Sequence, residues 1–236
     1  SKVPIMNSAG GTEVSGSILH CCLHRPFKVG SFNAPIPGMS ADILNLDGQK
    51  VSTNEMGELV MRKSSIGLTK SLWNDDKRYI DNYWSVIKDY WVHGDLASRD
   101  ADGHWYLHGR SDDTIKVSGK RIGPSELESV IVKSGKAKEV AAVGIPDENK
   151  GSKIILSIVP AENNDQKESF FEDLVIKDLG KSFKPDKVIF VKDLPKTRNM
   201  KIMRRVIKSC LANQDPGDLS TLLNPESVEE IRSHAI

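Results

Sequence analysis

The sequence predicts an α+β protein, and two observations carry that prediction. The first half holds short β-type runs separated by turn residues, whereas the second half, from about Asp112 onward, mixes strand and helix patterns in one small unit. The chain has 236 residues, of which 38% are hydrophobic. It can therefore bury a core, and it is long enough for one large domain or two small ones.

The elements expected in the first half are mostly strands. Residues 39–46 alternate apolar and polar positions and then meet Asp47-Gly48, a pair typical of a hairpin turn. Residues 75–88 are polar and aromatic and favour a helix. Further strands are expected at 57–61, 90–97 and 104–108.

The second half changes to a helical period. Apolar residues at helical spacing predict a helix over Pro124–Lys133, with Pro124 in its first turn and Gly135 after its end. Pro146 and Pro160 are expected to end two β-branched runs. Further helices are expected at 167–179 and 202–211, and further strands at 139–145, 153–159 and 187–191. The polar tail at 215–236 is expected to wrap loosely, apart from a short helix near 227–231.

Charge and cysteine content exclude several classes of protein. Lys and Arg number 33 against 32 Asp and Glu, and this near-balance argues against a general binder of nucleic acid or of membrane surfaces. No apolar run approaches the roughly 20 residues that a membrane helix needs. Cys21 and Cys22 are adjacent and Cys210 is the third cysteine, so reduced thiols in the cytoplasm are expected rather than disulfides or a zinc site.

Four segments carry residues suited to nucleotide chemistry. Leu194–Arg205 contains five cations within a ten-residue stretch. They indicate either a solvated basic face or a loop that delivers a lysine to a phosphate. In Gly10–Gly16, Thr12 offers a hydroxyl and Glu13 a carboxylate suited to a magnesium nucleotide. The third segment is Tyr90–Asp95, whose Gly-Asp end suits either contact with ribose hydroxyls or a simple turn. The fourth is Gly109–Glu128, which is rich in acids, bases and glycine and is either a solvated connector or a functional loop.

These four segments, in this order and spacing, resemble the adenylate-forming (AMP-binding) enzymes, which include acyl-CoA synthetases, peptide-synthetase adenylation domains and firefly luciferase. The resemblance covers nearly the whole chain and is strongest to the acetyl-CoA synthetase branch. GRSDDTIKVSGKRIGPSELES at 109–129 is similar to that branch's hinge motif, and PKTRNMKIMRR at 195–205 is similar to its lysine motif. The tail Asp218–Leu222 is similar to its ending.

The resemblance implies a two-domain organisation. Residues 1–111 would be the β-rich end of the large nucleotide-binding domain, part of a distorted β-barrel. Residues 112–236 would be the small, mobile α+β C-terminal domain, with its hinge at Asp112. The family's phosphate loop lies upstream of the Thr-Glu motif and is not found here. We therefore expect a C-terminal fragment that lacks its N-terminal portion and is inactive alone.

The family's reaction implies roles for individual residues. A small carboxylic acid reacts with ATP to give an acyl-adenylate and pyrophosphate, and CoA then displaces AMP. Lys201 would be the catalytic residue of the first step, Glu13 would meet Mg²⁺ through ATP, and Asp112 would be the hinge. The resemblance further assigns ATP and AMP binding to Gly10, Gly11, Thr12, Asp95, Arg110 and Arg121, and the CoA tunnel to Ser118 and Gly119.

Departures from the family pattern keep other readings open. Gly10 stands where acetyl-specific members carry tryptophan, which predicts an acyl pocket larger than acetate. Asn199-Met200 replaces the usual Ser-Gly before the lysine and predicts a stiffer loop. His93 precedes Gly-Asp where a small hydroxyl residue is common, and a structural role is expected for it. The alternatives are an adenylating enzyme that loads a carrier-protein thiol, and a non-catalytic module that binds a nucleotide or a partner.

Overall fold

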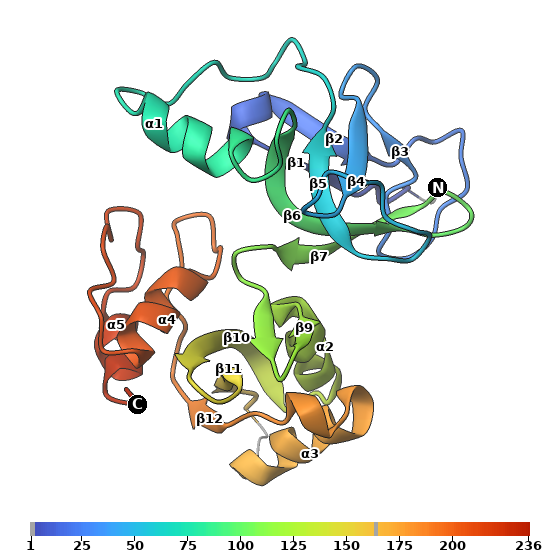
Figure 1. Ribbon diagram of the computed structural model, residues 1–236. Coiled ribbons are helices and arrows are strands. Elements are labelled where there is room, and N and C mark those ends of the chain that lie inside the picture. The colour runs from blue at the N-terminus through green and yellow to red at the C-terminus, as the bar shows by residue number, and fades with distance from the viewer. Residues whose placement is uncertain (1–2, 163–164) are drawn as a thin grey trace. The chain divides into compact units, whose positions relative to one another are not determined.

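The computed structural model describes residues 3–162 and 165–236 of the chain. It consists of two compact units, Ser1–Asp112 and Asp113–Ile236 (Figure 1). The first unit is built largely of antiparallel sheet and the second of mixed sheet and helix. The predicted α+β class is confirmed, and the strands of the first unit form two open sheets within the described residues.

The first unit contains two antiparallel sheets. The three-stranded sheet has the order β1-β2-β3, with β1 at Ser8–Gly11, β2 at Gly16–His20 and β3 at Ala34–Pro35. The four-stranded sheet has the order β4-β5-β6-β7, with β4 at Ala41–Leu44, β5 at Gly57–Met61, β6 at Trp91–Arg99 and β7 at Trp105–Arg110. The remaining elements are a 3₁₀ turn at Thr12–Val14, helix α1 at Asp76–Tyr79 and a π-helical turn at Ile80–Trp84.

Aromatic packing holds the core of the first unit. Trp91 in β6 is 1% exposed, and Tyr83 stacks on its indole with ring centroids 5.2 Å apart. Ile18, Leu19 and Leu59 are buried in the same core. Burial of such large side chains removes apolar surface from water, which is the main favourable contribution to folding.

The second unit is a sheet covered on both faces. Strands β10 at Ala137–Asp147 and β11 at Gly151–Pro160 are antiparallel, and β12 at Lys187–Phe190 pairs with β11 in parallel. Successive residues alternate between the faces: Ala142 packs in one core and Val143 in the other. Helices α2 at Pro124–Lys133 and α3 at Glu168–Leu179 cover the first face, and α4 at Arg204–Leu211 and α5 at Glu226–Arg232 cover the second (Figure 1).

A short hairpin precedes α2. It consists of β8 at Ile115–Val117 and β9 at Lys120–Ile122, and the apolar residues Ile115, Val117 and Ile122 are buried in the core on the α2 side of the sheet. A 3₁₀ turn at Lys181–Phe183 follows α3.

Several expectations from the sequence need correction. Strand β10 continues through Pro146, which pairs with Ser152; a proline is tolerated there because β10 is an edge strand. The helix expected at 75–88 ends at Tyr79 and continues only as the π-helical turn. The short helix expected near 227–231 is confirmed as α5, but the tail before it is not loose, because Leu219 and Leu222 pack against the second core and Asn224 is buried. Within the described residues no helix is both long and apolar enough to cross a membrane.

Candidate functional site

Two glycines bring the Thr-Glu loop close to its neighbours. Strand β1 ends at Gly11 and passes into the 3₁₀ turn, and the β1–β2 register shifts between Ala9 and Gly10. A Cβ on Gly10 would lie 2.1 Å from the carbonyl oxygen of Gly16. A side chain at this position would therefore require β2 to move, and the missing side chain leaves no open space among the described residues. A Cβ on Gly11 would lie 3.3 Å from Cε1 of His93.

Asp95 and Arg110 face each other across β6 and β7. They are direct partners in the strand register, and Arg110 Nη1 lies 3.7 Å from Asp95 Oδ1. Arg110 also donates through Nη1 to the His93 carbonyl at 3.0 Å and through Nε to Asp112 Oδ1 at 3.2 Å. Burial alone would lower the pKa of Arg110, but the carboxylates of Asp112 and Asp95 raise it. The guanidinium thus fixes two predicted site residues.

Gly94 makes room for this arginine. Its φ is +82°, in the left-handed region, and a Cβ there would lie 2.7 Å from Arg110 Nη2. A side chain at this position would have to displace the guanidinium, because it could not avoid the contact without moving the backbone. The glycine in the Gly-Asp pair is therefore required by the position of Arg110 as well as by its own backbone angle.

His93 joins the Thr-Glu loop to Asp95. Its ring is buried, and Nε2 lies 3.3 Å from Asp95 Oδ2. Its Nδ1 is buried and has no hydrogen-bond partner within the described residues. The ring therefore lies between the Gly11 backbone and the Asp95 carboxylate.

A cavity of about 370 Å³ lies beside these residues. Tyr83 lines it, and burial, followed by the nearby Glu13 carboxylate, raises the pKa of the tyrosine. Ser111 Oγ donates to Glu58 Oε2 at 2.8 Å on another wall. The cavity therefore presents carboxylate acceptors and one guanidinium, a set that suits sugar hydroxyls together with an anionic group. Other lining residues are His93, Gly94, Arg110 and Asp112.

In the second unit, Lys201 is presented by a tight hairpin. Residues Lys196 and Ile202 form an antiparallel bridge, and the Thr197 amide donates to the Lys201 carbonyl at 2.8 Å. The Lys201 side chain is exposed. Met200 has φ +62°, in the left-handed region that favours glycine, and it occupies the place where the similar motif has glycine. The turn therefore keeps its shape despite an unfavourable residue.

The two lysines of this motif have different environments. Lys196 is 6% exposed, and its ammonium lies 2.6 Å from both Glu139 Oε2 and Asp193 Oδ1. Burial alone would lower the pKa of Lys196, whereas the bonds to Asp193 and Glu139 raise it. Lys196 is thus held inside the unit while Lys201 remains in solvent. The motif resemblance singled out Lys201 and made no prediction for Lys196; the alternation of buried and exposed positions in a hairpin is the signal that could have indicated the burial of Lys196.

The tip of the β8–β9 hairpin carries the predicted CoA residues. Ser118 and Gly119 have φ +49° and +80°, which is the two-residue turn that matches the twist of paired strands. The Ser118 amide donates to the Lys150 carbonyl at 2.8 Å, which fixes the tip to the β10–β11 turn. Arg121 is exposed on β9. A cavity of about 440 Å³ adjoins this tip, lined by residues that include Ser118, Lys150, Lys181, Ser182 and Lys184.

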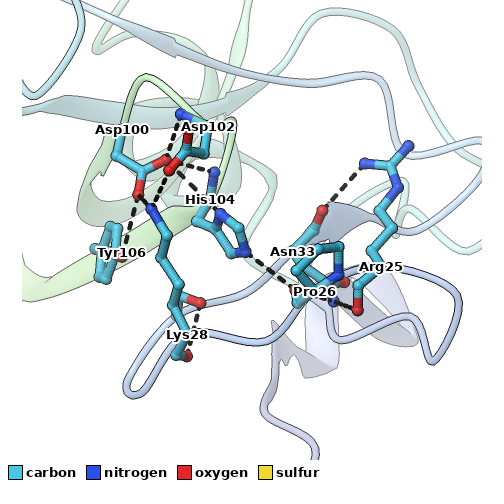
Figure 2. A network of polar contacts seen from close by, with 9 residues as sticks. Arg25, Pro26, Lys28, Asn33, Asp100, Asp102, His104 and Tyr106 are labelled. Carbon is cyan, nitrogen blue, oxygen red and sulfur yellow. Dashed lines mark hydrogen bonds and ion pairs between the residues drawn. The ribbon is translucent and has the colours of Figure 1, made fainter.

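A separate polar network supports the sheet that carries Asp95 and Arg110. Lys28 Nζ lies 2.6 Å from Asp100 Oδ2 and 2.6 Å from Asp102 Oδ2 at the β6–β7 turn. Figure 2 shows these two ion pairs. His104 Nε2 is hydrogen-bonded to the Pro26 carbonyl at 3.0 Å. The hydrogen bond from Lys28 is the main reason that the pKa of Asp100 falls to about 2. The network fastens the loop before β3 to the end of the hairpin.

The structure thus gathers the predicted residues into separate groups. In the first unit, His93 lies beside both Gly11 and Asp95. Arg110 contacts both Asp95 and Asp112. Thr12 is exposed beside them. In the second unit the β8–β9 hairpin and the lysine hairpin are distinct elements.

Comparison with known proteins gives the family. Residues 126–201 match the model of the AMP-binding enzyme C-terminal domain. The chain belongs to the adenylate-forming superfamily. The acetyl-coenzyme A synthetase of Methanothrix thermoacetophila is 38% identical over 237 residues, which cover 98% of this chain and 36% of that protein. The acetyl-coenzyme A synthetase of Helicobacter pylori strain P12 is 38% identical over 247 residues, or 99% and 37%.

A solved adenylate-forming enzyme shares the fold. The structure of acetoacetyl-CoA synthetase from Streptomyces lividans superposes with a TM-score of 0.86 and 22% sequence identity, and covers 97% of this chain and 35% of that chain. The present chain therefore spans little more than a third of the length of the curated relatives that it matches.

Proposed function

We propose that the protein containing these residues is an ATP-dependent acyl-CoA synthetase, which forms acyl-CoA, AMP and pyrophosphate through an acyl-adenylate. The observation that carries the proposal is Lys201, an exposed lysine on a hairpin that the buried ion pairs of Lys196 fasten to the unit. A fixed cation of this kind suits a reaction in which negative charge develops on a phosphoryl oxygen. The similarity to acetyl-coenzyme A synthetases over nearly the whole chain supports it.

The nucleotide would be held by the first unit. In the proposal, Asp95 accepts hydrogen bonds from the ribose hydroxyls, and Arg110, fixed by Asp112 and Asp95, contributes a second polar contact. Gly10, Gly11 and Thr12 let the backbone and a hydroxyl approach the nucleotide. Arg121, exposed on β9, is proposed as a phosphate contact.

Glu13 fits a magnesium nucleotide. Among the described residues no group of three or more His, Cys, Asp and Glu side chains gathers to hold a metal ion. Mg²⁺ needs none, because with nucleotides it is bound by one or two carboxylates, phosphate oxygens and water. Glu13 supplies one hard carboxylate on the loop beside the cavity, and the ion would neutralise phosphate charge there.

The two half-reactions would use different elements. Lys201 acts in the first by stabilising charge between the carboxylate and the α-phosphate. Ser118 and Gly119 act in the second, where the turn without a bulky side chain lets the CoA thiol pass. Asp112 is the proposed hinge between them, because a few loop residues can absorb the required backbone change.

The location, acid and remaining chain are further parts of the proposal. We place the enzyme in the cytoplasm, and a preceding portion of the protein would supply the phosphate loop and most of the acyl pocket. The acid is proposed to be longer than acetate because of Gly10. That part rests on the sequence resemblance alone, since the structure leaves no room at Gly10 itself.

Formation of AMP tests the proposal. The complete polypeptide, supplied with ATP, Mg²⁺ and acids from acetate to octanoate, should form AMP at a rate that rises when free CoA is added. Formation of one acyl-CoA per AMP would support the synthetase. AMP formation without any response to free CoA would favour carrier-protein loading, and an acetate optimum would refute the larger pocket.

A further inference from the structure

The segment before α5 is bound to the lysine hairpin. Leu222 forms an antiparallel bridge with Thr197, and the Leu223 amide donates to the Lys196 carbonyl at 2.8 Å. This segment therefore lies against the hairpin as a short third strand. It belongs to the tail that the sequence predicts to be loose, so its contacts with the hairpin are unexpected.

Asn224 is the side chain that closes this arrangement. It is 7% exposed, and its Oδ1 accepts from the Lys196 amide at 3.0 Å. Its Nδ2 donates to Asp193 Oδ2 at 2.7 Å and to the Leu194 carbonyl at 2.8 Å. One amide thus satisfies backbone groups on either side of Pro195 and a carboxylate, at a place with little access to water.

Asp193 and Lys196 connect this amide to the sheet. Asp193 uses one oxygen for Asn224 and the other for the Lys196 ammonium, which also pairs with Glu139 on β10. The base of the hairpin is therefore fixed in three directions: to the sheet, to the loop after β12, and to the tail. Buried networks of this kind specify one geometry when every member is paired.

The backbone of Lys201 is hydrogen-bonded to the base of the hairpin. Between Lys196 and Ile202 the chain makes a single turn, in which the Lys201 amide donates to Thr197 Oγ1 at 3.2 Å and the Thr197 amide donates to the Lys201 carbonyl. Thr197 is itself the residue bridged by Leu222. A shift at the base would consequently move the backbone of Lys201, because these two hydrogen bonds join Lys201 directly to Thr197.

We propose that Asn224 is a positioning residue for Lys201: through Lys196 and Thr197 it holds the hairpin in the place from which the Lys201 ammonium acts on the reacting phosphate. The proposal rests on the proposed function for the role of Lys201, but the contacts that it invokes lie wholly within the second unit. Asn224 touches no reacting atom. Its effect is confined to the half-reaction that uses Lys201.

The kinetic test compares the two half-reactions in the complete polypeptide. Asn224→Ala should lower the rate of ATP–pyrophosphate exchange by about tenfold or more, since displacement of a catalytic group by about 1 Å costs up to about a hundredfold. Transfer of the acyl group from supplied acyl-adenylate to CoA should stay within about twofold of wild type. Asn224→Ser retains a neutral hydroxyl that can accept from the Lys196 amide and donate to a neighbouring acceptor, so it should lose less ATP–pyrophosphate exchange activity than Asn224→Ala. Gln214→Ala, which truncates an exposed amide just before the tail, is the matched control and should change neither rate.

Hydrogen exchange supplies a readout that does not depend on activity. In the complete polypeptide, peptides covering 195–203 should exchange hydrogen faster in Asn224→Ala than in wild type or Gln214→Ala, because the Lys196 amide loses its acceptor and the hairpin held by the Thr197 and Lys201 amides is loosened. Peptides covering α2 should be unchanged. If Asn224→Ala fails to fold, Asn224→Ser carries both measurements.

The outcomes separate this proposal from the function on which it rests. Unchanged hydrogen exchange at residues 195–203 overturns the positioning role of Asn224, and so do equal losses of rate in both half-reactions. Faster hydrogen exchange at residues 195–203 together with a normal rate of adenylation also overturns it, because the hairpin would then be loosened without any effect on the step that uses Lys201. If Lys201→Ala leaves adenylation intact, the proposed function fails, whatever the hydrogen exchange shows.

Discussion

Replacing Lys196 by methionine should destabilise the second unit and leave the first unchanged. The substitution keeps an unbranched apolar stem and removes an ammonium that is 6% exposed and 2.6 Å from two carboxylate oxygens. Hydrogen bonds to charged groups contribute about 1.5–3 kcal/mol each. Without the cation, Glu139 and Asp193 would also repel one another.

The partial exposure of the two acids reduces this figure. The side chains of Glu139 and Asp193 are 29% and 43% exposed, so water replaces part of what the ammonium provided. We therefore expect a loss of about 2 kcal/mol in the free energy of unfolding of the second unit. Lys201→Met is the matched control, because the Lys201 side chain is exposed; a surface substitution of this kind changes stability by within about 0.5 kcal/mol.

The distribution of tryptophan makes the assay specific. All four tryptophans, Trp73, Trp84, Trp91 and Trp105, belong to the first unit. In urea titrations of the 236-residue chain, tryptophan fluorescence therefore reports the first unit, whereas far-ultraviolet circular dichroism reports both. Lys196→Met should shift the circular dichroism midpoint to lower urea and leave the fluorescence midpoint in place. An unchanged circular dichroism transition, or a destabilisation by Lys201→Met of equal size, would refute the assignment of Lys196 to structure and Lys201 to solvent.

Three further predictions concern the candidate site and its support. Gly94→Ala should weaken nucleotide binding by the complete polypeptide at least about tenfold, because its Cβ would meet Arg110 Nη2; calorimetry with ATP measures this, and an unchanged affinity would count against a role of Arg110 at the nucleotide. Gly119→Val places a branched residue at φ +80° and should slow thioester formation from supplied acyl-adenylate more than it slows adenylation; equal slowing of both steps would remove this turn from the thiol path. The pKa of Asp100 lies at about 2 in the folded state, below its ordinary value of 3.8, so its contribution to stability is present above pH 3.8 and is lost as the pH falls through about 2. Fluorescence-monitored urea midpoints should therefore fall more between pH 4 and pH 2 for wild type than for Asp100→Asn, and parallel curves would contradict the network in Figure 2.

Local patterns in the sequence predicted much of the fold. The helix at Pro124–Lys133 and the strand at Gly57–Met61 have the expected bounds, because the proline and the glycine at their starts and the apolar spacing within them are local signals. The strands missed were those whose pairing is decided elsewhere. Gly10 and Gly11 carry no β signal of their own, and β1 exists because β2 returns beside it after the 3₁₀ turn.

The tail was predicted only in part. The helix near 227–231 was expected, and Val228 and Ile231 of α5 cover one face of the sheet. The contacts that Leu222 and Asn224 make with the lysine hairpin were not expected. Asn224 is a single polar residue whose partners, Asp193 and Lys196, lie about 30 positions earlier in the chain. No local pattern indicates such a contact, because it depends on how α5 packs.

The motifs named residues for the candidate site but not their contacts. They indicated Asp95, Arg110 and Asp112, and in the structure Arg110 contacts both carboxylates. The link through His93 was missed, because a lone histidine in a sequence gives no indication of the carboxylate that it will face. The burial of Lys196 was missed for the same reason: the motif singled out Lys201, and only the fold of the hairpin shows that Lys196 is buried.

The central claim is that Lys201 acts in adenylation and in no other step, and the direct measurement is the effect of Lys201→Ala on the two half-reactions of the complete polypeptide. Loss of one fixed cation opposite developing charge should lower ATP–pyrophosphate exchange by about a hundredfold or more, equivalent to about 3 kcal/mol of transition-state stabilisation. Transfer from supplied acyl-adenylate to CoA should remain near the wild-type rate, and Lys208→Ala, an exposed lysine on α4, should change neither. Equal losses in both half-reactions, or normal exchange without Lys201, would contradict the account.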